Sequence, residues 1–61
     1  MIDERDLGRT VELAVNGITK PLFYSGVVVS NNKYEVEIKD RKIGNIFITK
    51  KYIITHRFIS I

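Results

Sequence analysis

The sequence predicts an all-β protein: a small, strongly bent antiparallel barrel of five strands, preceded by a short helical turn. Isoleucine and valine make up 16 of the 61 residues, against three leucines and one alanine, and β-branched side chains favour strands over helices. Apolar and polar residues alternate along several short segments, which is the period of a strand with one buried face. Turn residues separate these segments by roughly 8 to 12 residues, as in small barrels. No repeat or linker divides the chain, so residues 1–61 read as one domain.

The N-terminal part of the chain predicts a helical turn followed by the first strand. Residues 2–9 suit one or two helical turns, because Asp3 can cap the turn and Asp6 favours a helix N-terminus. From there the period changes to two, and residues 10–16 form a half-buried strand that ends at the turn dipeptide Asn16-Gly17. Its buried face carries the alternate residues Val11, Leu13 and Val15.

The next two strands are predicted at residues 22–30 and 33–39. Gly26 lies inside the first of them, and a glycine there marks a bend, a bulge or a close approach of another backbone. Asn31-Asn32 tolerates positive φ and so suits a tight hairpin. In residues 33–39 the pattern places Tyr34, Val36 and Ile38 inward and Lys33, Glu35, Glu37 and Lys39 outward.

The last third of the chain predicts a turn and two more strands. Residues 40–44 form the turn, and residues 45–49 form a strand with alternate isoleucines on its buried face. A pair of lysines then interrupts the apolar pattern. The final strand is predicted at residues 52–61, with a bend near Thr55 or His56.

The small size of the chain favours self-association. A core of this size supplies about 3 to 5 kcal/mol, and small natural domains add disulfides, a metal or oligomerisation. The chain has no cysteine and one histidine, so neither a disulfide nor a four-ligand zinc site is expected. We predict no metal and no cofactor. The first residues are acidic and no run approaches the about 18 apolar residues of a membrane span, so we expect a cytoplasmic protein.

Charge is distributed unevenly along the chain. The net charge is +3, but residues 1–12 carry a net charge of −2. Residues 41–61 hold five basic residues and no acidic one, interleaved with Phe47, Tyr52, His56 and Phe58. Basic and aromatic residues together suit a polyanion with stackable bases. The alternative is that the lysines only solubilise turns and protect strand edges.

Three stretches within residues 10–55 resemble a known family. The first strand ends in Val15-Asn16-Gly17. The second stretch runs from Gly26 through Val28, Asn31-Asn32 and Tyr34 to the alternating Val36 and Ile38. The third is Ile-Thr-Lys-Lys-Tyr-Ile-Ile-Thr, residues 48–55. Together they resemble the Sm-like family and are closest to the Hfq-type RNA chaperones, with the second and third stretches similar to the first and second Sm motifs.

The chain also departs from that family. Residues 17–26 form a longer stretch than in Hfq. Asn31, Asn32 and Lys51 stand where the family has an aromatic residue, an aspartate and a histidine. The sequence also resembles the β-domain of small-conductance mechanosensitive channels, which is itself Sm-like.

The resemblance implies an SH3-like, Sm-like barrel that assembles into a homo-oligomeric ring, a hexamer or heptamer, by pairing the edge strands of neighbouring copies. In such a ring, lysines in the last turn would gather near the axis, where single-stranded RNA could pass. Tyr34 is then the candidate base-stacking residue, or else a core residue, and Asn32 a hydrogen-bonding neighbour. The predicted RNA-binding residues are Asn32, Tyr34, Lys50, Lys51, Arg41 and Lys42.

Catalysis is not expected. The chain has one imidazole, no cysteine, and serines outside any nucleophile motif. Glu35 and Glu37 lie between lysines and suit a mixed-charge surface better than an acid and base pair. Two alternative functions stay open: an SH3-like module that binds a peptide or an added strand, and a small structural or accessory protein, such as a viral one, without RNA binding.

Overall fold

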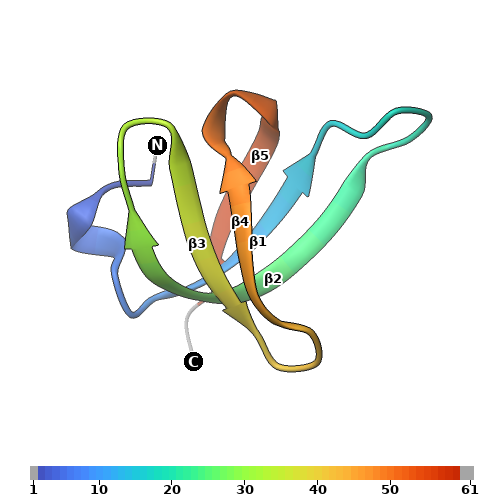
Figure 1. The fold of residues 1–61 in the computed structure, drawn as a ribbon. Coiled ribbons are helices and arrows are strands. Elements are labelled where there is room, and N and C mark those ends of the chain that lie inside the picture. The colour runs from blue at the N-terminus through green and yellow to red at the C-terminus, as the bar shows by residue number, and fades with distance from the viewer. Residues whose placement is uncertain (1, 60–61) are drawn as a thin grey trace.

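The computed structural model describes residues 2–59 and confirms an all-β fold. Five antiparallel strands form one sheet in the order β4-β3-β2-β1-β5 (Figure 1). The strands are β1 (Thr10–Val15), β2 (Leu22–Asn31), β3 (Glu35–Asp40), β4 (Gly44–Thr49) and β5 (Ile53–Ile59). The helical elements in this part of the chain are two 3-10 turns, η1 (Glu4–Asp6) and η2 (Lys50–Tyr52). No helix within residues 2–59 has the length and apolar character to cross a bilayer.

The predicted N-terminal turn is confirmed as η1, with Asp3 as its cap. The Asp3 carboxylate accepts a hydrogen bond from the backbone N–H of Arg5 at 2.9 Å. The Asp6 carboxylate accepts one from the backbone N–H of Asp3, also at 2.9 Å, which completes a capping box. Asp6 is buried and Arg9 pairs with it at 3.1 Å.

The predicted bend of the second strand is confirmed. Residues 22–27 of β2 pair with β1, whereas the pairing with β3 runs from Val27 to Asn31, so one long strand connects the two halves of the sheet (Figure 1). A side chain at Gly26 has no room, because a Cβ there would lie 2.5 Å from the carbonyl oxygen of Lys39. The glycine therefore allows β3 to approach the bend closely.

The core lies on the concave side of the bent sheet. Its buried members alternate along the strands as the period predicts, and Ile2 from the N-terminal segment joins them. The buried hydrophobic residues are Ile2, Val11, Leu13, Val15, Val28, Val36, Ile38 and Ile48. Tyr34 is not among them. The inward orientation predicted for Tyr34 is wrong, because β3 begins at Glu35 and leaves Tyr34 in the preceding turn.

The sheet is not closed, so the predicted barrel is wrong in that respect. β4 and β5 are the two edges of the sheet and are not paired with each other. Closure requires the two edge strands of the sheet to pair with each other, and the residue pattern of the strands does not encode this pairing. η2 connects the end of β4 to the start of β5 (Figure 1). Within residues 2–59 each edge leaves one side without a neighbouring strand.

The last strand begins one residue later than predicted. β5 spans Ile53–Ile59, and residues 60 and 61 of the predicted strand lie outside the described residues. The bend predicted near Thr55 or His56 corresponds to an irregularity slightly earlier in the strand. The register shifts between Ala14 and Val15, whose partners on β5 are Thr55 and Ile53, so a bulge falls at Ile54.

Candidate nucleic-acid interface

Two segments that are distant in sequence meet at one end of the sheet. The backbone N–H of Lys50, at the start of η2, donates to the carbonyl of Tyr34 in the β2–β3 turn at 2.8 Å. The Lys50 ammonium also donates to Oδ1 of Asn31 at 3.0 Å. We call this region the Tyr-Lys end and define it as residues 31–34 and 50–52. Four of the six predicted binding residues lie here: Asn32, Tyr34, Lys50 and Lys51.

Asn32 shapes the turn through its side chain. Its Oδ1 accepts hydrogen bonds from the backbone N–H groups of Tyr34 and Glu35, both at 2.8 Å, which is an Asx-type turn. The turn was predicted because Asn31-Asn32 tolerates positive φ, and that reason is wrong: within residues 2–59, no residue other than glycine has a positive φ. The oxygen is therefore occupied, and the exposed amide group of Asn32 is the part that can donate to a ligand.

Tyr34 projects from the turn into solvent. It is 67% exposed, so the core-packing alternative does not hold. The Lys33 ammonium lies 5.5 Å from the centre of its ring. A cation therefore lies over the exposed ring, as in a cation–π contact.

Tyr52 forms a second pair of the same kind, which the sequence analysis did not place in the site. It is 48% exposed, and the Lys51 ammonium lies 5.2 Å from the centre of its ring. The dipeptide Lys-Tyr occurs at 33–34 and again at 51–52, and that recurrence is the signal in the sequence that could have identified it. Two aromatic faces, each beside an ammonium group, can contact bases and phosphates together.

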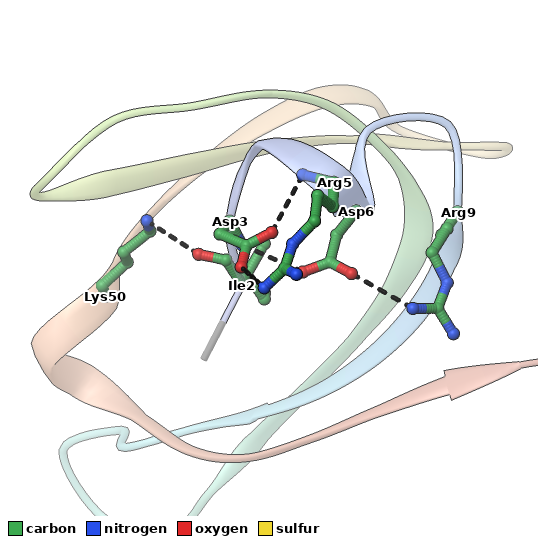
Figure 2. A network of polar contacts seen from close by, with 6 residues as sticks. All are labelled: Ile2, Asp3, Arg5, Asp6, Arg9 and Lys50. Carbon is green, nitrogen blue, oxygen red and sulfur yellow. Dashed lines mark hydrogen bonds and ion pairs between the residues drawn. The ribbon is translucent and has the colours of Figure 1, made fainter.

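Lys50 has a different environment from Lys51. Its ammonium donates to the carbonyl oxygen of Ile2 at 3.2 Å (Figure 2) as well as to Asn31. Ile2 is buried, so Lys50 joins the N-terminal segment to the β2–β3 turn. Its half-buried ammonium is held by oxygens of the protein, whereas Lys51 is exposed.

Arg41 and Lys42 do not join the other predicted residues. They lie in the turn between β3 and β4, at the opposite end of β3 from Tyr34 (Figure 1). Asp40 organises this turn, because its Oδ1 accepts hydrogen bonds from the backbone N–H groups of Lys42 at 2.7 Å and Ile43 at 3.1 Å. Those bonds, from Lys42 first and then Ile43, hold the pKa of Asp40 below its ordinary value.

Two further ion pairs lie at the surface. Arg5 pairs with Asp3 and Arg57 with Glu12, and the bonds from Arg5 hold the pKa of Asp3 below its ordinary value. Glu37 accepts from Ser30 Oγ at 2.8 Å and from Asn45 Nδ2 at 2.7 Å.

Histidine and the carboxylates do not form a metal site in the described part of the chain. No group of three or more such residues there could hold a metal ion. His56 is exposed on β5 and contacts the ring of Phe58 edge to face, with ring centres 5.7 Å apart.

Comparison of the chain with protein-family models, with curated proteins and with solved structures finds no match.

Proposed function

We propose that the chain is an Sm-like protein of the Hfq type, which assembles into a homo-oligomeric ring and binds single-stranded RNA at the Tyr-Lys end. The observation that carries the proposal is that two exposed tyrosine and lysine pairs, 33–34 and 51–52, lie in two turns joined by the backbone bond from Lys50 to Tyr34. These pairs come from the two stretches that resemble the first and second Sm motifs.

The chemistry of this end suits unpaired bases. Stacking of a base on an aromatic side chain contributes about 1 to 3 kcal/mol, and both Tyr34 and Tyr52 are exposed. Lys33 and Lys51 have no ion-pair partner within residues 2–59, so their ammonium groups are available to phosphates. The amide of Asn32 adds a hydrogen-bond donor beside the first tyrosine. Such a site favours single strands, because bases inside a duplex do not expose their faces.

The open edges of the sheet support self-association. β4 and β5 each leave a row of backbone groups without a strand partner in the described structure. Phe47 on β4 and Ile54 on β5 are large exposed hydrophobic residues. Pairing β4 of one copy with β5 of the next would satisfy the backbone and bury these side chains. Because that contact joins two different edges, it repeats from copy to copy and closes into a ring when the rotation allows.

RNA binding is tested by fluorescence anisotropy with uridine-rich and adenine-rich oligonucleotides over a range of salt concentrations. We expect Tyr34→Ala and Tyr52→Ala each to weaken binding by about 5- to 150-fold, the equivalent of one lost stacking contact. Tyr34→Phe is the matched control, because it keeps the ring. Lys51→Met should reduce the slope of log K against log salt by about 0.7, whereas Lys20→Met in the β1–β2 loop should not. Full affinity in both alanine variants would refute the proposal.

Assembly is tested by native mass spectrometry at micromolar concentration, where we expect a hexamer or heptamer. Phe47→Lys places a charge on the outer face of edge strand β4 and should dissociate the ring. Phe23→Lys is the control, since Phe23 is also exposed but lies on β2 and not on β4 or β5, the two strands that the ring is proposed to join. A wild-type protein that is monomeric under these conditions would rule out the ring.

The open edges also favour a second candidate function, an SH3-like module that binds a protein segment as an added strand. This function predicts a monomer or dimer whose β4 or β5 edge accepts an extended peptide. It also predicts no salt-dependent affinity for RNA, so the two experiments above discriminate between the candidates.

A further inference from the structure

We infer that the protein has a second binding site, for the phosphate groups of a nucleic-acid strand, at the opposite end of β3 from the Tyr-Lys end. The site is a groove of about 420 Å³ on the outer face of the sheet. We call it the basic groove. It is lined by the hydroxyl-bearing Thr10 and Ser25 and by the cationic Lys39, Arg41 and Lys42, together with Gly26, Val27 and Asp40.

The bend of β2 forms this groove. Val27 pairs with Thr10 on one side and with Lys39 on the other, so these three residues form one row across the sheet. Beside them, the bare backbone of Gly26 lets the end of β3 lie within contact distance. The turn that follows β3 begins here, and its residues Arg41 and Lys42 border the groove.

The cations of the basic groove are not neutralised by the protein. Among residues 2–59, Arg5, Arg9 and Arg57 each pair with a carboxylate, but Lys39, Arg41 and Lys42 have no ion-pair partner. Asp40 is the one acidic residue of the lining, and its Oδ1 accepts hydrogen bonds from its own turn. The lining thus keeps a net charge of +2.

The lining selects phosphate over bases. It contains ammonium, guanidinium and hydroxyl donors but no aromatic side chain, so it suits an anion and offers no aromatic ring to a base. The choice of a nucleic-acid strand as the source of the phosphates rests on the proposed function. The six residues of β3 span about 20 Å, which separates the basic groove from the Tyr-Lys end. One subunit would therefore contact one nucleic-acid strand at two separate places, or contact two nucleic-acid strands.

The inference is tested by titrating 15N-labelled protein with a uridine-rich oligonucleotide and, separately, with pyrophosphate, which has phosphates but no base. We expect both ligands to shift the backbone signals of residues 10, 25 and 39–42, and the oligonucleotide also to shift those of 31–34 and 50–52. The variant Lys39→Gln/Arg41→Gln/Lys42→Gln should lose the groove shifts and lower the salt slope of oligonucleotide binding by about 2, because each lost phosphate contact on a single strand lowers it by about 0.7.

Two single substitutions, each of which removes one positive charge, control for the change in net charge. Arg41→Gln should lower the slope by about 0.7, and Lys20→Gln in the exposed β1–β2 loop should leave it unchanged. If the oligonucleotide shifts the Tyr-Lys end alone and the triple variant keeps the full slope, the basic groove is refuted and the proposed function stands. If the oligonucleotide does not bind but pyrophosphate shifts the groove signals in the wild type and not in the triple variant, the phosphate site stands and the proposed function fails. If neither ligand shifts any signal, both are refuted.

Discussion

Replacing Gly26 by alanine is the sharpest test of the bent sheet. A Cβ at this position would lie 2.5 Å from the carbonyl oxygen of Lys39, 2.8 Å from its carbonyl carbon and 3.2 Å from the backbone nitrogen of Asp40. All three are backbone atoms, so no side chain can rotate away and β3 must move. Forced overpacking costs about 1 to 3 kcal/mol. Removing a glycine from the unfolded chain returns about 0.4 to 1 kcal/mol, and the middle values of the two ranges leave a net loss of about 1 to 2 kcal/mol.

Thermal and urea unfolding followed by circular dichroism would measure this loss. For a domain of this size we expect the melting temperature to fall by about 4 to 16 °C, and the urea midpoint to fall by about 1 to 2 M if m is about 1 kcal/mol/M. Gly44 provides the control, because it has a positive φ and open space around it. Gly44→Ala should destabilise and Gly44→Asn should be tolerated better, whereas Gly26→Asn should be no better than Gly26→Ala. A Gly26→Ala protein as stable as the wild type would refute the close approach of β3.

Two further predictions follow from individual contacts. Lys50→Met keeps the apolar stem of the side chain but removes the hydrogen bonds to Ile2 and Asn31. We therefore expect the free energy of unfolding, measured by thermal unfolding, to fall by about 1 to 3 kcal/mol, with little change in the salt slope of RNA binding. Unchanged stability with a reduced slope would contradict this role of Lys50. Because the pKa of Asp40 is lowered, this carboxylate binds a proton less readily in the folded state than in the unfolded state. The contribution of Asp40 to stability is therefore present above pH about 3.9 and is lost as the pH falls towards the lower pKa of the folded state. Urea midpoints measured from neutral pH down to pH about 3 should therefore fall more steeply for the wild type than for Asp40→Asn, and parallel curves would contradict the prediction.

Much of the local structure was predictable because it depends on residues that are close in sequence. The strands follow the period-two pattern, and Asp3 caps the turn that its position indicated. Gly26 marked the bend correctly, since a glycine inside a strand has few other uses. Tyr34 was misplaced because the pattern could not fix where β3 begins. The strand begins two residues later than predicted, so Tyr34 lies before it, while Val36 and Ile38 keep the predicted inward face.

The candidate site was only partly predictable. Its residue types were visible in the basic, aromatic-rich last third of the chain. Their grouping was not, because it depends on which turns share an end of the sheet. Lys51 and Tyr34 are brought to the same end, whereas Arg41 and Lys42 are carried to the other by the length of β3.

The sequence by itself determined the all-β class, the approximate strands and the position of the bend, because each of these follows from side-chain period and from turn residues a few positions apart. The tertiary structure alone decided that β4 and β5 remain separate, that the ammonium of Lys50 is held by Ile2 and Asn31, and that η2 begins at a backbone bond to Tyr34. These outcomes depend on contacts between segments far apart in the chain, and no local pattern of residues encodes the distance between such segments.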